Sequence, residues 1–139
     1  MRQHFADIVI KTRGPALYNF TDKAKRIVEQ SEIAEGLLTC FVRHTSASLT
    51  IQENADPDVL RDLTSFLDRL VSRDENLYRH NSEGPDDMPS HIRSMLTQTS
   101  LSIPLRDGRM ILGAWQGLYL FEHRDAPHER EITLHLIGE

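Results

Sequence analysis

The chain has 139 residues, of which 39% are hydrophobic and 27% are charged, and these values fit one globular domain over residues 1–139. Its net charge of −5 argues against a protein that binds nucleic acid non-specifically, because phosphate backbones are bound by basic surfaces. No apolar stretch is long enough to cross a bilayer, and Asp7 falls where a secretory signal would continue its apolar core, so we expect no membrane partner.

Strand and helix patterns alternate in the first third of the sequence. Residues His4–Lys11 alternate apolar and polar side chains, as a half-buried strand does, until Gly14-Pro15 ends the pattern. Thr21 is a suitable cap for a short helix. Leu37–Arg43 is apolar on both faces, which predicts an interior strand, and Ser48–Glu53 alternates again as a half-buried strand.

Cys40 is the only cysteine and lies inside the predicted interior strand. A single cysteine excludes an internal disulfide, and a thiol in an apolar strand is expected to be a small buried side chain. The absence of a disulfide framework and of a targeting segment predicts a cytoplasmic protein.

Two helices are predicted in the middle of the sequence. Asp56 is a good N-cap, Pro57 fits the first helical position, and apolar residues then recur with helical spacing as far as Val71. A shorter helix is predicted to begin near Asp87. The polar loop His80–Pro89 leads into it.

Strands dominate the last third of the sequence. Leu101–Leu105 predicts a strand whose Pro104 requires an edge or an N–H position facing away from the ladder. Asp107-Gly108 is a hairpin signal into a long strand, Arg109–Arg124, which glycines bend or bulge. Glu131–Ile137 predicts the closing strand. The order of elements favours an α+β sandwich with a mostly antiparallel sheet.

The first polar candidate site is the segment His44-Thr45-Ser46-Ala47-Ser48, which follows the predicted interior strand. Hydroxyl groups and small residues at a strand end supply side-chain and backbone donors that can surround an anion. A Ser/Thr turn carrying a surface histidine is the alternative, and the segment alone does not decide between the two.

The segment from His80 to His91 is a more specific candidate. It combines two histidines with the carboxylates of Glu83, Asp86 and Asp87. If the helix begins near Asp87, then Asp87 and His91 are four residues apart and share one helix face. Neutral imidazole favours zinc and other late transition metals, and a neighbouring carboxylate can orient it or bind with it. The alternative is a solvated loop in which Asp87 only caps the helix.

The third candidate lies on the predicted strand from Trp115 to Arg124. Alternation places Gln116, Glu122 and Arg124 on one face, where Arg124 could pair with a phosphate or with Glu122. An amphipathic edge strand is the alternative.

Together these segments resemble the YjbQ-like family, whose members are often labelled secondary thiamine-phosphate synthases. The motifs that carry the resemblance are His44-Thr45-Ser46-Ala47-Ser48 with Glu53-Asn54, Glu83-Gly84 with Asp86-Asp87-Met88-Pro89-Ser90-His91, and Gly113-Ala114-Trp115-Gln116-Gly117 with Glu122-His123-Arg124. The resemblance spans essentially the whole chain and implies an α+β sandwich that assembles as a homotrimer. It also implies that His44, His80 and His91 converge on a metal or an anion. Asn81 departs from the family pattern, since relatives commonly have aspartate there.

The residues and the resemblance lead to one functional expectation: a metal-assisted enzyme that acts on a small phosphorylated substrate, with secondary thiamine-phosphate synthase activity by pyrophosphate displacement. Histidine ligands favour a zinc-like divalent ion, and magnesium is the other option. The expected metal ligands are His44, His80 and His91. The acid/base candidates are Glu83, Asp87 and Glu122. The expected substrate-binding residues are Thr45, Ser46, Gln116 and Arg124. The alternatives are a non-catalytic protein that binds a metal or metabolite, and a metal-dependent hydrolase.

Overall fold

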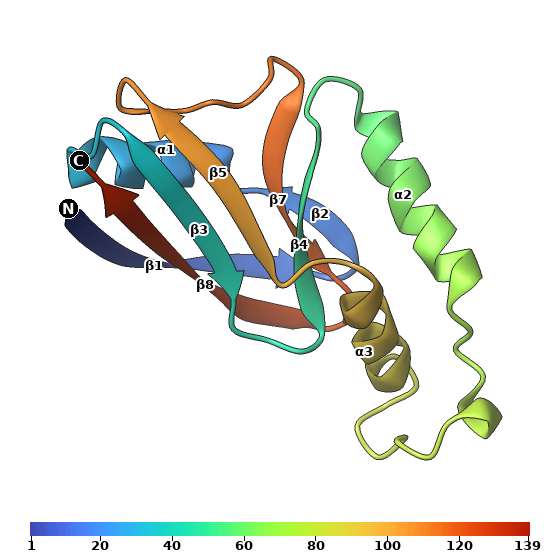
Figure 1. Cartoon of the computed structure of the whole chain (residues 1–139). Coiled ribbons are helices and arrows are strands. Elements are labelled where there is room, and N and C mark those ends of the chain that lie inside the picture. Colours follow the sequence, from blue (N-terminus) through green and yellow to red (C-terminus); the bar gives the residue numbers. More distant parts are fainter.

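Two antiparallel β-sheets form the frame of the molecule in the computed structural model, which describes residues 1–139 (Figure 1). The five-stranded sheet has the order β1 (Arg2–Arg13), β8 (Pro127–Gly138), β3 (Gly36–Val42), β5 (Ser100–Arg106), β6 (Arg109–Met110). The three-stranded sheet has the order β2 (Ala16–Asn19), β7 (Gln116–Glu122), β4 (Ala47–Glu53). The helices are α1 (Thr21–Ser31), α2 (Pro57–Leu70) and α3 (Asp87–Leu96), with a 3₁₀ turn at Glu75–Leu77.

A single cluster of buried apolar side chains draws on both sheets and on α1. Leu38, Leu49, Leu120 and Leu134 contribute to it from four strands and are completely buried. Cys40 belongs to the same cluster, as its apolar strand predicts, and burial raises the pKa of its thiol to about 12. The α+β class and the antiparallel pairing expected from the sequence are confirmed.

Several local signals predicted the observed elements. The Asp56 side chain accepts a hydrogen bond from the Asp58 amide and caps α2, and α3 begins at Asp87. Asp107 and Gly108 both have positive φ, 52° and 70°, as the tight turn of the β5–β6 hairpin requires. The Pro104 carbonyl accepts a hydrogen bond from the Ile111 amide at 3.0 Å, just beyond β6, so the missing N–H of Pro104 faces the edge of the sheet rather than β3.

The long strand predicted over Arg109–Arg124 was wrong, because the chain leaves one sheet and enters the other within it. Residues 109–110 form β6, residues 111–115 cross between the sheets, and β7 starts at Gln116. The side-chain amide of Asn54 fixes residues 111–115 in place by donating hydrogen bonds to the carbonyls of Ala114 and Gln116, both at 3.4 Å. Such a change of sheet is set by tertiary contacts that strand periodicity does not reveal.

Two further details near the N-terminus differ from the prediction. The strand β2 was missed because its four residues are too few to establish an alternation. Thr21 was expected to cap α1 but is its first residue, and its hydroxyl instead accepts a hydrogen bond from the Leu118 amide of β7. The side chain of Asn19 accepts from the Thr21 amide at 2.9 Å.

The helices α2 and α3 lie together at one side of the molecule, with the long 71–86 connection between them (Figure 1). Only Leu67 of α2 is buried, so this helix packs loosely, against β2 and β4 of the three-stranded sheet. The segment that follows α2 is anchored by Arg73, which forms a two-point ion pair with Asp125 at 2.8 and 3.0 Å. None of the three α-helices combines the length and apolar character that a bilayer-spanning helix needs.

Candidate metal centre

Three potential metal ligands meet at the N-terminal end of α3. His80, Asp87 and His91 each offer one ligand atom, an imidazole nitrogen or a carboxylate oxygen, and these three atoms lie within 4.8 Å of one another. Asp87 Oδ2 is 2.5 Å from His80 Nε2 and 3.4 Å from His91 Nε2. Asp87 and His91 share a helix face because they are four residues apart, and the preceding loop brings His80 back toward them.

Neighbouring groups orient the cluster. His91 Nδ1–H donates to the Thr45 carbonyl at 2.9 Å, which leaves the lone pair on Nε2, the atom that faces Asp87. The second carboxylate oxygen of Asp87, Oδ1, accepts from Arg124 Nη1 at 2.8 Å. The backbone of the His44–Ser48 segment and the end of β7 therefore both support this cluster.

Arg124 is fully engaged with the loop that carries the cluster. Its Nε donates to Asp86 at 2.8 Å, its Nη1 to Asp87, and its Nη2 to the Glu83 carbonyl at 3.0 Å. The hydrogen bond to Asp86 is the main reason that the pKa of Arg124 is raised. This geometry favours a positioning role for Arg124 over the phosphate-binding role expected from the sequence.

The Asp87 carboxylate is held ionised despite being 2% exposed. Burial would raise its pKa, but the hydrogen bond with His80 and the charge of Arg124 hold that pKa below its usual value. A buried, ionised carboxylate with one oxygen facing two imidazoles is suited to binding a cation.

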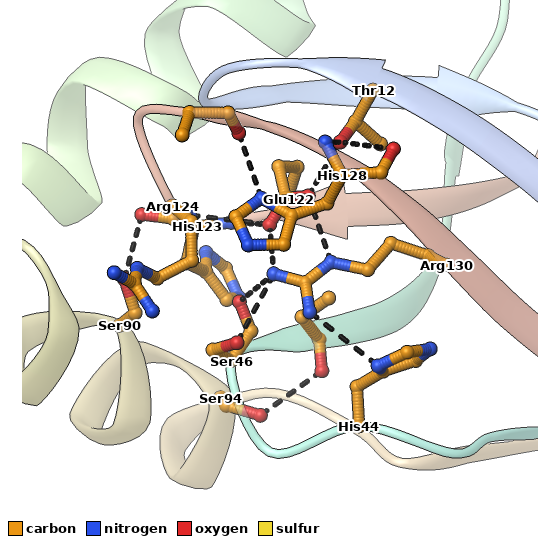
Figure 2. A network of polar contacts seen from close by, with 12 residues as sticks. Thr12, His44, Ser46, Ser90, Ser94, Glu122, His123, Arg124, His128 and Arg130 are labelled. Carbon is orange, nitrogen blue, oxygen red and sulfur yellow. Dashed lines mark hydrogen bonds and ion pairs between the residues drawn. The ribbon is translucent and has the colours of Figure 1, made fainter. Parts of the chain in front are cut away.

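His44 does not join the group of three ligands within one chain. Its Nε2 accepts from the Glu131 amide at 2.7 Å, and its Nδ1 lies 3.4 Å from Arg130 Nη1 (Figure 2). Burial and the charge of Arg130 lower the pKa of His44, so its imidazole is neutral at physiological pH.

A shallow pocket of about 290 Å³ nevertheless connects His44 with His91. Its other lining residues are Thr45, Ser94, Met95, Thr97 and Thr99. The structure thus places two of the expected site histidines, together with the expected substrate-binding residue Thr45, around one polar hollow beside the cluster.

Glu122 lies at the centre of a separate, buried polar network (Figure 2). Its carboxylate accepts two hydrogen bonds from Arg130 and one, at 2.6 Å, from Thr12. The backbone amides of His123 and Arg124 add two more. Burial would raise the pKa of Glu122, but the bonds from Arg130 and Thr12 keep it below its usual value.

This geometry favours a structural role for Glu122 over the acid/base role expected from the sequence, because the side chain is completely buried and both oxygens are engaged. Ser46, expected to bind substrate, belongs to the same network and accepts from Arg130 Nη2 at 3.0 Å.

Gln116 was expected to share a pocket with Glu122 and Arg124, but within one chain Gln116 lies too far from Glu122 to do so. It begins β7 whereas Glu122 ends it, and six residues of extended strand separate them by about 20 Å. Its side chain accepts from the Gly113 amide at 2.7 Å and lines a different hollow together with Lys25 and Arg109. Alternation identified a shared strand face but not the distance along it.

Sequence reasoning missed the buried residues Arg93, His123 and Arg130. For Arg130 a signal was present, since it falls on the inward-facing register of β8 with Ile132, Leu134 and Leu136. A charged residue at an inward position indicates a buried partner, here Glu122.

His123 predicts a pH dependence of stability. It is 1% exposed, and burial, with the charge of Arg93, lowers its pKa to about 3. The unfolded chain binds a proton at this histidine below a pKa of about 6.5, whereas the folded protein keeps the buried imidazole neutral. The folded state is therefore fully stable above pH 6.5 and loses stability as the pH falls toward 3. Between pH 7.5 and pH 5 this group alone should remove about 2 kcal/mol from the free energy of unfolding.

Urea unfolding of wild-type protein and of His123→Gln at both pH values measures this effect. The variant should lose about 2 kcal/mol less than the wild type over the interval. Equal losses would show that His123 is not kept neutral by burial.

Comparisons with known proteins agree with this architecture. Residues 6–139 match the family model described as UPF0047 protein YjbQ-like. A UPF0047 protein from Synechocystis is 56% identical over 138 residues, covering 99% of this chain and 94% of the relative, and UPF0047 protein YjbQ from Escherichia coli O157:H7 is 43% identical over 93% and 92%. The crystal structure of a YbjQ-like protein from Sulfolobus solfataricus superposes with a TM-score of 0.91 at 26% identity, covering 99% of both chains. This chain therefore belongs to the YjbQ-like UPF0047 family.

Proposed function

We propose that the protein is a metal-dependent enzyme that acts on a small phosphorylated molecule, with His80, Asp87 and His91 as the ligands of one divalent ion. The convergence of two imidazole nitrogens and one carboxylate oxygen within 4.8 Å carries the proposal. Catalytic zinc is bound in this way, by two histidines and an acid, in several hydrolases. The side chains of His80 and His91 are 44% and 31% exposed, which leaves one side of the cluster open for a substrate.

The donor set fits such an ion. Tetrahedral bonds of about 2 Å place ligand atoms about 3.3 Å apart, close to the 3.4 Å between Asp87 Oδ2 and His91 Nε2. The contact between His80 Nε2 and Asp87 Oδ2 is shorter because the two atoms share a proton in a hydrogen bond. A bound ion would displace this proton. Imidazole nitrogens favour zinc over magnesium, which prefers oxygen ligands.

The reaction that we favour is the pyrophosphate displacement of a thiamine-phosphate synthase, as the family resemblance implies. It joins a hydroxymethylpyrimidine diphosphate to a thiazole phosphate. The divalent ion would supply positive charge for the leaving pyrophosphate. The hydroxyl groups of Thr45 and Thr99, in the hollow beside His91, would bind a substrate phosphate. Glu83 is the proposed acid/base residue, because its carboxylate is exposed and lies 3.6 Å from His80 Nε2.

The experiment that tests this proposal compares turnover of phosphorylated metabolites by zinc-loaded protein, metal-free protein and folded variants of Asp87 and His91. Turnover should require both the ion and the two side chains. Release of inorganic phosphate without transfer would indicate a hydrolase instead. Zinc binding without any turnover would indicate a binding protein.

We also propose that the chain assembles as a homotrimer, and the exposed apolar residues support an assembly. Phe5, Phe41, Phe66 and Leu70 are 64%, 50%, 52% and 56% exposed, and Phe66 and Leu70, four residues apart on α2, share one helix face. The number three comes from the family resemblance. Sedimentation equilibrium should give three times the chain mass at micromolar concentration, and a monomer there would contradict the proposal.

A further inference from the structure

A second hollow lies beside α3, away from the candidate metal ligands. It is a cavity of about 590 Å³ between α2, β2 and the end of β7, and Arg93 forms part of its wall. Arg93 follows His91 by two residues on α3, and side chains two apart project about 200° from each other around a helix axis. Arg93 therefore faces α2 whereas His91 faces the Thr45 carbonyl.

The guanidinium of Arg93 is buried without a full set of acceptors. The residue is 3% exposed, and its Nε is buried with no hydrogen-bond partner. Both of its hydrogen bonds come from Nη2 and are long, 3.3 Å to Asp68 Oδ1 and 3.4 Å to the Val71 carbonyl. Buried polar groups in proteins are nearly always paired, so an unpaired guanidinium edge at a cavity indicates an acceptor that comes from elsewhere.

The charge of Arg93 is also poorly compensated. Its carboxylate partner, Asp68, has a side chain that is 64% exposed and that also pairs with Arg73, at 3.7 Å. Burial, together with the charge of Arg73, lowers the pKa of Arg93. Glu122 borders the cavity as well, but its two oxygens are already engaged by Arg130 and Thr12. The positive charge of Arg93 is therefore only partly neutralised by Asp68, and a bound anion would neutralise the remainder.

The remaining walls suit an amphiphilic small molecule. Leu17, Leu60, Leu67 and Phe121 provide apolar surface, and Thr64 and Ser65 provide hydroxyl groups from α2. The volume is within the usual range for small-molecule sites, which combine apolar walls with a few polar groups.

We propose that this cavity binds a small organic anion with an apolar body, whose phosphate or carboxylate group is held by the guanidinium group of Arg93 at the cavity wall. The hydroxyl groups of Thr64 and Ser65 lie on the α2 side of the same ligand. The site is separate from the candidate metal centre and does not depend on the proposed reaction.

Isothermal titration calorimetry of metal-free protein with phenyl phosphate, benzoate and phenol tests the proposal. At least one of the two anions should bind with one site per chain, and phenol, which has the same ring and no charge at neutral pH, should bind at least tenfold more weakly. Binding of phenol as tight as that of the anions, or no binding of either anion, would overturn the proposal.

Three variants locate the site. Arg93→Met should weaken anion binding at least tenfold, because it removes charge-assisted hydrogen bonds. Thr64→Phe fills the cavity from the α2 side without touching the buried charge and should also abolish binding, which keeps the test decisive if Arg93→Met fails to fold. His91→Ala, the matched control at the candidate metal centre, should leave binding unchanged. Loss of anion binding in His91→Ala with retention in Thr64→Phe would assign the anion to the metal centre and overturn the proposal.

Discussion

Replacing Asp87 with asparagine, or His91 with alanine, should lower the rate of thiamine phosphate formation by roughly a thousandfold, about 4 kcal/mol of transition-state stabilisation. Each change removes a proposed metal ligand and with it the positive charge that balances the leaving pyrophosphate. Asp87→Asn preserves the shape of the buried side chain and an acceptor for Arg124. Turnover by purified variants, with folding checked by circular dichroism, measures the effect.

Two controls separate the candidate centre from general damage. His135→Ala removes a histidine that pairs with Gln3 on the five-stranded sheet, and Cys40→Ala removes a core thiol, so both should retain turnover. His44→Ala should cost less than His91→Ala, because His44 faces the shared hollow rather than the cluster. Full turnover in folded Asp87→Asn and His91→Ala would place the activity elsewhere.

Replacing Glu122 with alanine should destabilise the fold by about 3–5 kcal/mol, because it leaves the buried charge of Arg130 without a partner. The network also joins β1 to β7 and β8 through Thr12, so its loss affects both sheets. The change in unfolding free energy, measured with urea, gives the size of the effect.

The matched control is Glu131→Ala on the same strand as Arg130. Glu131 pairs with Arg43 at 3.3 Å on the surface, where such pairs contribute less than about 1 kcal/mol. A Glu122 variant as stable as the Glu131 variant would contradict the structural role and restore Glu122 as an acid/base candidate.

The sequence predicted those parts of the site that depend on local geometry. Asp87 and His91 belong together because a helix brings residues i and i+4 together, and the helix start was visible in the sequence. His80 belonged to the same candidate segment, and the resemblance to the family implied that it converges with His91. The expected place of His44 among the ligands rests on the resemblance alone. Its two nitrogens face the backbone amide of Glu131 and the side chain of Arg130, which lie on β8, far from His44 in the sequence.

Features that depend on pairing between distant segments could not be predicted in this way. The full engagement of Arg124 by the 83–87 loop arises where the end of β7 meets the start of α3, and no local pattern shows that meeting. The crossing at residues 111–115 separates two strands that appear continuous in sequence, because β6 has only two residues, too few for a pattern that shows where it ends. Local patterns thus identified helices, turns and the paired site residues, whereas the partners of buried charges required the fold.

Zinc binding by tag-free wild-type protein and by the ligand variants tests the assignment of His80, Asp87 and His91 most directly. Elemental analysis after dialysis against zinc should give about one ion per chain for the wild type, and for His44→Ala and His135→Ala as controls. His80→Ala, Asp87→Asn and His91→Ala should each retain little or none. Absence of zinc from the wild type, or an undiminished stoichiometry in these three variants, would contradict the metal centre.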